Sequence, residues 1–264
     1  AYLKVLELNP YHFPSWNNIG QIYAYDLHMY EKARDSYLKA LLIFKNEPVV
    51  CSNLGNLYWD KLHDYNEAEK FYLKSLEADP INKNTLNSLG NLYLDGFHKY
   101  PEAEKMFLKA IELNNTFVYS KYNLLFLYRD RMNRIDDAQQ LFDSIEITEE
   151  LADSHNLNAC LFELYKRNEG LASDFLLKAF EAIGYDLPSN TKDDWWRFGS
   201  VVVKLGYGQW LRSQMEKAGY DKILSPYFVA IRAMTEKDSE GYLNSKAVEI
   251  REPARKLVDI MRKL

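Results

Sequence analysis

Apolar positions in the N-terminal half of the chain recur with the period of an amphipathic helix. Within residues 16–23 (WNNIGQIY), Trp, Ile, Gly and Tyr stand at i, i+3, i+4 and i+7, which places them on one helix face. Within residues 33–40, a small residue, an aromatic and another small residue stand at i, i+4 and i+7. No segment alternates with period two over a useful length, so the pattern predicts an all-α chain of paired helices.

This two-helix pattern returns every 35 residues. Gly20, Gly55 and Gly90 hold equivalent places in the first helices, and Leu125 holds the fourth. Equal spacing of this kind is typical of a stacked solenoid, whose extended surface favours binding to another macromolecule. The expected packing positions of the second helices are Ala33, Tyr37 and Ala40, then Ala68, Tyr72 and Ser75, then Ala103, Phe107 and Ala110, and finally Ala138, Phe142 and Ile145.

Over residues 1–147 these positions resemble the tetratricopeptide repeat, whose pattern is W-x-x-L-G-x-x-Y followed by A-x-x-x-F and a proline. The resemblance implies a right-handed α-α superhelix. Each unit has 35 residues where the family pattern has 34, and we expect the extra residue in the loop between the two helices. Leu125 replaces the glycine in the fourth unit and no proline follows it, so that unit should pack differently.

The pattern divides the chain into three predicted parts. Residues 1–147 form the array, in which residues 1–10 read as the second half of a repeat and suggest a piece of a longer protein. Residues 148–188 read as a degenerate repeat, and residues 189–264 as an irregular C-terminal helical extension. In that extension, Pro226 and Pro253 mark helix starts, and helices are expected over about 192–205, 209–218, 226–237, 239–250 and 253–264.

Composition narrows the class of function. The net charge of −5 offers no bulk attraction to nucleic acid or to an anionic membrane, and no apolar run reaches the ~18 residues that span a bilayer. Cys51 and Cys160 give neither a disulfide framework nor metal-ligand spacing, which favours a reducing, cytoplasmic setting. The three histidines at 35-residue intervals, His28, His63 and His98, read as a repeated turn residue rather than as metal ligands.

Catalytic signatures are missing from the sequence. It contains no P-loop, no GxSxG and no HExxH, so we expect no catalytic residue, metal or cofactor in this chain, and any catalytic domain to lie outside it. One alternative stays open, which is an enzyme site in residues 189–264 built around Asp194, Trp195, Trp196 and Arg197.

A row of polar residues on the predicted first helices is the better candidate site. In tetratricopeptide arrays these helices line a concave groove. Side-chain amides carry both a donor and an acceptor, so a row of them could pair with the main chain of an extended segment. Asp60, Asp95 and Asp130 follow one turn later, so we expect a neutral or basic protein or peptide partner. The predicted groove residues are Asn17, Gln21, Tyr25, Asn53, Asn56, Trp59, Asp60, Asn87, Asn91, Asp95, Tyr122, Phe126 and Arg129.

A second resemblance concerns the C-terminal stretch. Its segments DWWRFGSVVVKLGYGQWL, SPYFVAIRAM and YLNSKAVEIREPARKLV are similar to the tails of large bacterial repeat proteins of the STAND NTPase class, including antiviral sensors. That resemblance implies a ligand-sensing domain, with the NTPase and any oligomerisation regions outside this chain. The sequence thus leaves open a free-standing adaptor and a sensor domain.

Overall fold

The computed structural model describes residues 1–146, 152–183 and 192–219, with the shorter stretches 229–230, 232–234, 239–244, 254–256 and 258–259. Side chains are not described at 152–153, 182–183, 192–197, 239 and 241. Two compact units can be distinguished, Ala1–Ile145 (unit 1) and Glu146–Leu264 (unit 2), and each is treated separately. The predicted ranges 1–147, 148–188 and 189–264 stay a prediction.

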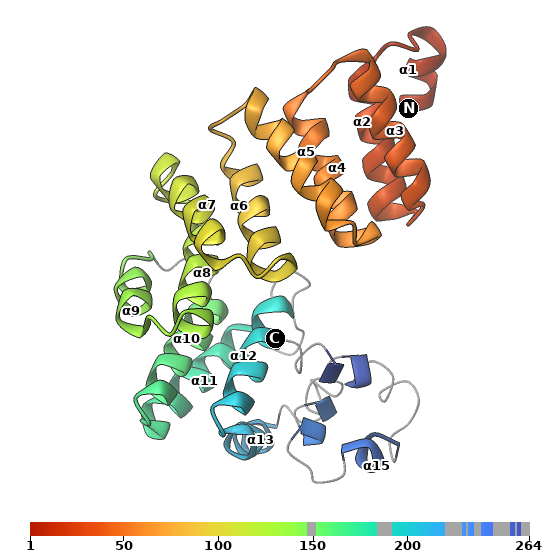
Figure 1. Cartoon of the computed structure of the whole chain (residues 1–264). Coiled ribbons are helices and arrows are strands. Elements are labelled where there is room, and N and C mark those ends of the chain that lie inside the picture. Colours follow the sequence, from red (N-terminus) through yellow and green to blue (C-terminus); the bar gives the residue numbers. More distant parts are fainter. Residues whose placement is uncertain are drawn as a thin grey trace. The chain divides into compact units, whose positions relative to one another are not determined.

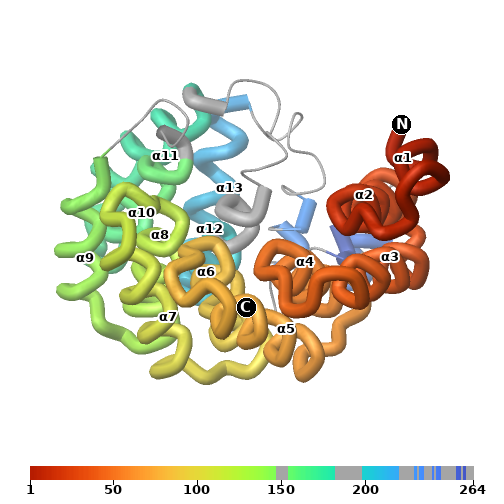
Figure 2. The backbone as a smooth tube through the Cα atoms, turned by 90° about the horizontal axis from the view of Figure 1, so that it is seen from above, coloured from red at the N-terminus to blue at the C-terminus, as the bar shows by residue number. Residues whose placement is uncertain are grey.

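Unit 1 is a short helix, α1 (Tyr2–Leu8), followed by four helical hairpins (Figure 1). Its described residues contain helices and no strands, as the periodicity predicted. The first helices lie along the inner side of a curve and the second helices along its outer side (Figure 2). The hairpins are α2 (Phe13–Gln21) with α3 (Tyr30–Ile43), α4 (Pro48–Leu57) with α5 (Tyr65–Ala78), α6 (Lys83–Asn91) with α7 (Tyr100–Leu113), and α8 (Val118–Phe126) with α9 (Ile135–Asp143).

Local hydrogen bonds explain where these helices begin. The Asn82 side chain accepts from the Thr85 backbone N–H at the start of α6, and Asp64 accepts from the Glu67 N–H at the start of α5. Such caps satisfy donors that have no partner within the helix. Pro48 occupies the first turn of α4, where its missing N–H costs nothing.

Close contact between glycine and an aromatic ring holds each of the first three hairpins together. A Cβ built on Gly55 would lie 2.7 Å from the Tyr72 ring, and one built on Gly90 would lie 2.5 Å from the Phe107 ring. Only glycine lets the first helix approach the second this closely. All the predicted second-helix packing positions are buried, which confirms that part of the sequence analysis.

The extra residue of each repeat is found in the first helix rather than in the loop. Every first helix ends in a π-helical turn, in which the chain takes about one residue more than in an α-helical turn. In the third hairpin, for example, the Phe97 N–H donates to the Leu92 oxygen at 3.0 Å. The expectation that the residue lengthens the loop is therefore wrong, because the wide turn absorbs it. The four π-helical turns are η1 (Ile22–Asp26), η2 (Tyr58–Leu62), η3 (Leu92–Gly96) and η4 (Leu127–Arg131).

The repeated histidines close these turns. His28, His63 and His98 have φ angles of 54°, 53° and 54°, in the left-handed region, and Asn133 occupies the fourth equivalent position with φ 53°. Histidine and asparagine are among the few residues enriched in this conformation. The interpretation of these histidines as a repeated turn residue is confirmed, and the backbone accounts for them without a ligand.

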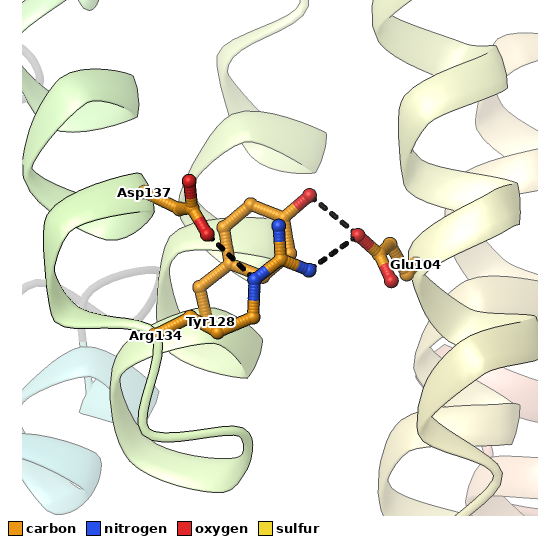
Figure 3. Close-up of polar contacts among 4 residues, drawn as sticks. All are labelled: Glu104, Tyr128, Arg134 and Asp137. Atoms are coloured by element: carbon orange, nitrogen blue, oxygen red, sulfur yellow. Dashed lines mark hydrogen bonds and ion pairs between the residues drawn. The ribbon is translucent and has the colours of Figure 1, made fainter.

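Stacking of the third hairpin on the fourth involves a group of charged and aromatic side chains (Figure 3). Arg134 binds Glu104 at 2.8 Å and Asp137 at 2.6 Å, and its guanidinium lies 4.1 Å from the centre of the Tyr128 ring. The Tyr128 hydroxyl donates to Glu104 at 2.7 Å. Burial, and to a lesser extent this hydrogen bond, raises the pKa of Tyr128 to about 12. Glu104 thus links α7 to the following hairpin.

Similar groups occupy the two earlier junctions. Between the second and third hairpins, Lys99 lies 5.6 Å from the centre of the Tyr93 ring. Burial raises the pKa of Tyr93, and the nearby Glu69 carboxylate raises it further. Between the first and second hairpins the charges are reversed, because Arg34 takes the place of the glutamate and Asp64 the place of the cation. The junctions therefore share a geometry but differ in polarity.

A double-mutant cycle on Glu104 and Arg134 should give a coupling free energy of about 0.5–1 kcal/mol. We expect a modest value because Arg134 and Glu104 keep 38% and 22% of their side-chain surface exposed to water. The change in unfolding free energy on urea denaturation of the alanine variants measures it. A control cycle on Glu67 and Lys70, a pair within α5, should give about 0.2–0.5 kcal/mol. If the coupling free energy at the junction is no larger than in this control, Glu104 and Arg134 do not stabilise the contact between the third and fourth hairpins.

The fourth hairpin departs from the others. Leu125 stands in place of glycine, and α9 has 9 residues where α3, α5 and α7 each have 14. The predicted difference in packing is therefore observed, and the second helix of this hairpin is the one that shortens.

In unit 2 the described helices share one apolar core. They are α10 (Ala152–Tyr165), α11 (Glu169–Ile183), α12 (Lys192–Lys204), α13 (Gly208–Lys217) and α15 (Ser239–Asn244). The predicted stripes, Leu157, Leu161 and Leu164 on α10 and Ala172, Leu176 and Ala179 on α11, are all buried. Gly206, with φ 87°, lies in the break between α12 and α13, as predicted. The remaining expected helices around Pro226 and Pro253 lie largely outside the described residues.

Candidate functional site

The predicted groove residues lie on the first helices, α2, α4, α6 and α8, and on the π-helical turns that follow them. These helices form the inner side of the curve in Figure 2. We call this set of residues the inner face. Its members differ in exposure and in hydrogen bonding, and these differences decide which of them a partner could reach.

Three of the inner-face asparagines, together with Asn123 next to them, form hydrogen bonds from one repeat to the next. Asn53 Nδ2 donates to Asn17 Oδ1 at 2.9 Å, and Asn123 Nδ2 donates to Asn87 Oδ1 at 3.1 Å. Ser120 Oγ also donates to Asn87 Oδ1, at 2.8 Å. These side chains tie neighbouring first helices together. The sequence analysis assigned Asn17, Asn53 and Asn87 to a partner, whereas the structure shows that they also stabilise the stacking.

Gln21, Asn56 and Asn91 form a second row of amides, one in each of the first three hairpins. Of these three, only Asn56 accepts a hydrogen bond from a tyrosine hydroxyl within the described residues. In the second hairpin the Tyr72 hydroxyl donates to Asn56 Oδ1 at 2.7 Å, which leaves Asn56 Nδ2 to donate elsewhere. In the first hairpin, Gln21 is exposed, and the buried Tyr37 hydroxyl makes no hydrogen bond within the described chain. In the third, phenylalanine replaces the tyrosine, and the buried Oδ1 of Asn91 has no partner within the same part of the chain.

Aromatic and acidic residues adjoin these amides in the first two hairpins. Tyr25 is 47% exposed, Asp60 is exposed and Trp59 is partly buried. Burial raises the pKa of Tyr25, and the nearby Asp60 carboxylate raises it further. A phenol ring beside a carboxylate is an arrangement that can hold a cation.

The fourth hairpin offers less to a partner than the sequence suggested. Phe126 and Arg129 are buried. Arg129 and Asp130 form a two-point ion pair with distances of 2.8 and 2.7 Å, and their side chains are 3% and 4% exposed. Asp130 is therefore neutralised by its neighbour and adds no net negative charge to the acidic row. Tyr122 and Asp95 are half-buried.

The cysteines and the potential metal ligands were considered in the described residues. Cys51 and Cys160 are buried free thiols, and burial raises the pKa of Cys51 to about 11, which makes it a poor nucleophile. No group of three potential metal ligands is found in the described part of the chain. The side chains of Asp194, Trp195, Trp196 and Arg197 lie outside the described residues, so the alternative enzyme site stays a prediction. Across the described stretches, no helix is both long and apolar enough to cross a bilayer.

Sequence reasoning missed three features of unit 1. The π-helical turns and the left-handed position of Asn133 were not expected, although the 35-residue spacing of the histidines pointed to a special turn. The junction residues were also missed, and the only signal for them is that Glu69 and Glu104, like Lys99 and Arg134, stand 35 residues apart.

Comparison with solved structures shows the fold. A tetratricopeptide repeat protein from Parabacteroides merdae aligns with a TM-score of 0.62 at 18% identity, over 98% of this chain and 88% of that one. Pseudomonas aeruginosa pilF aligns with a TM-score of 0.60 at 18% identity, over 89% and 97%. YrrB, described as a tetratricopeptide repeat protein with an unusual peptide-binding site, aligns with a TM-score of 0.52 at 23% identity, over 69% and 92%.

Sequence comparison supports the same assignment for part of unit 1. A search of curated proteins finds no match. Residues 1–35 and residues 49–82 each match a family model described as tetratricopeptide repeat. The chain therefore contains tetratricopeptide repeats and folds as an all-α solenoid of that type.

Proposed function

We propose that this chain is a non-catalytic interaction module that binds an extended polypeptide along the inner face of unit 1. The observation that carries the proposal is the hydrogen bond between the Tyr72 hydroxyl and Asn56 Oδ1. It orients the Asn56 amide so that Nδ2 can donate to a main-chain carbonyl. Gln21 and Asn91 are the equivalent residues of the neighbouring repeats, so three amides at regular intervals can bind a main chain without reading its sequence.

The charge of the inner face favours a neutral or basic segment. Asp60 and Asp95 contribute negative charge, and the exposed Tyr25 ring can pack against a lysine or arginine side chain. Arg129 adds no net positive charge, because it is paired with Asp130. The peptide-binding site ascribed to YrrB is consistent with this use of the fold.

The cellular setting belongs to the same proposal. Two buried free cysteines suit a reducing compartment such as the cytoplasm. The sensor role follows only from the resemblance of the C-terminal stretch to STAND-class proteins. A P-loop upstream in the full-length protein would support the sensor, and its absence there would favour a free-standing adaptor.

Peptides selected by the intact chain from a random 12-residue phage library should be enriched in lysine and arginine. In synthetic form they should bind the Asn56→Ala/Asn91→Ala variant about 5- to 160-fold more weakly, because each of the two lost hydrogen bonds is worth roughly 0.5–1.5 kcal/mol. Isothermal titration calorimetry measures the affinities. Asn66→Ala, at an exposed site on α5, is the matched control and should leave binding unchanged.

Two results would refute the proposal. One is an unchanged affinity of the double variant, with thermal unfolding showing that it is folded. The other is tighter binding of a peptide in which every lysine and arginine has been replaced by glutamate.

A further inference from the structure

A cavity of about 250 Å³ lies in unit 2, between α11 and α13. Leu176 and Phe180 line it and are buried, whereas Leu177 lines it with 49% of its surface exposed. The interior of the cavity is thus lined by apolar side chains, and Leu177 at its opening is accessible to solvent. The full set of lining residues is Ser173, Asp174, Leu176, Leu177, Phe180, Gln214, Lys217 and Ala218.

Two opposite charges line the same cavity. Asp174 and Lys217 are both exposed, and neither makes an ion pair with the other or with any other side chain of the described chain. Ser173 already donates its hydroxyl to the Glu169 oxygen, so it contributes little further binding capacity. A group that fits this cavity should therefore combine an apolar portion with one positive and one negative charge.

The volume indicates what kind of group this is. Sites for small molecules usually enclose about 300–1,000 Å³, so this cavity is on the small side for a complete ligand. Protein interfaces commonly place one large apolar side chain in such a pocket, with polar groups around it. In a peptide, the residues on either side of that side chain can supply the two charges.

We propose that this cavity holds one bulky apolar side chain of a partner polypeptide, flanked in that partner by a basic and an acidic residue. The basic neighbour pairs with Asp174 and the acidic neighbour with Lys217. The apolar side chain packs on Leu176, Leu177 and Phe180. This docking site is independent of the inner face of unit 1, because no residue is shared between them.

Three capped tripeptides test the proposal on the intact chain. They are Lys-Phe-Glu, Lys-Ala-Glu and Glu-Phe-Glu, each acetylated and amidated. With leucine methyl groups isotopically labelled, NMR should show Lys-Phe-Glu shifting the methyl signals of Leu176 and Leu177 with a Kd of about 1 mM, as expected for so small a ligand. Lys-Ala-Glu should bind at least about tenfold more weakly because it lacks the apolar ring. Glu-Phe-Glu should also bind more weakly, because one glutamate faces Asp174.

Substitutions then locate the site. Leu177→Asp should weaken binding of Lys-Phe-Glu about tenfold, whereas Leu171→Asp should not, since Leu171 is 48% exposed on the same helix but does not line the cavity. Asp174→Lys should make Glu-Phe-Glu the tighter ligand. The Asn56→Ala/Asn91→Ala variant should bind as wild type does, so failure here and failure at the inner face are separate results.

Several outcomes would overturn the proposal. These are equal binding of the alanine and phenylalanine tripeptides, no shift of the Leu176 and Leu177 methyl signals, or equal effects of Leu177→Asp and Leu171→Asp. Tighter binding of free phenylalanine than of Lys-Phe-Glu would also overturn it, because the cavity would then be a small-molecule site.

Discussion

Tyr72→Ala is expected to lower the unfolding free energy by about 3–5 kcal/mol, as deletion of a large buried aromatic side chain usually does. Tyr72 is fully buried, its ring lies against Gly55, and its hydroxyl bonds Asn56. The truncation leaves a cavity between α4 and α5 and removes the partner of Asn56. Urea denaturation followed by circular dichroism measures the loss. Tyr58, in the π-helical turn η2, is only partly buried, so Tyr58→Ala should lower the unfolding free energy by less than Tyr72→Ala.

Adding or removing one hydroxyl group at Tyr37, Tyr72 and Phe107 separates the contribution of the hydroxyl to stability from that of the ring. Tyr72→Phe should cost about 1–2 kcal/mol, because the buried oxygen of Asn56 loses its donor. Tyr37→Phe should be close to neutral, since that hydroxyl makes no hydrogen bond within the described residues. Phe107→Tyr should stabilise the chain by about 1 kcal/mol by supplying the missing donor to Asn91. Equal costs for Tyr72→Phe and Tyr37→Phe would contradict this account.

Gly90→Ala is expected to destabilise the chain by about 1–3 kcal/mol, although alanine is the better helix former. The added Cβ would lie 2.5 Å from Cε1 of Phe107, whose ring is fully buried. The third hairpin must therefore open slightly. The shift in urea midpoint, with an unchanged dependence on urea concentration, reports this cost.

Gly170→Ala is the matched control. Gly170 is also helical, but its added Cβ would meet only the Asn168 side chain, at 3.7 Å. This substitution should be neutral or stabilising by up to about 1 kcal/mol, through helix propensity alone. If both substitutions stabilised the chain, the close contact between glycine and aromatic ring would not be what limits the approach of the two helices.

Much of the fold follows from the sequence because each repeat presents the same local signals. The glycine and aromatic positions at 35-residue intervals predicted which faces pack, and burial of Tyr37, Tyr72 and Phe107 confirms them. The placement of the extra residue was wrong for a physical reason. Residue type does not reveal whether a longer repeat widens a helical turn or lengthens a loop, since both can end at a left-handed His28 or His63.

The candidate site was predicted less completely. The sequence placed the amides on one side of the first helices, but it could not show which amides bond one another. The pairing of Asn53 with Asn17 depends on how far one repeat is rotated relative to the next. The neutralisation of Asp130 by the adjacent Arg129 likewise depends on side-chain conformations that no spacing rule gives.

The reversed polarity of the first junction makes the repeats unequal as building blocks. Excision of residues 82–116 would bring Glu69 opposite Arg134, a combination of the same kind as those already present. Excision of residues 47–81 would instead set Arg34 against Lys99, two cations around the Tyr93 ring. By this reasoning the third repeat can be lost or copied by recombination more readily than the second. The charges at the first junction therefore fix the order of the repeats at the N-terminal end of the array.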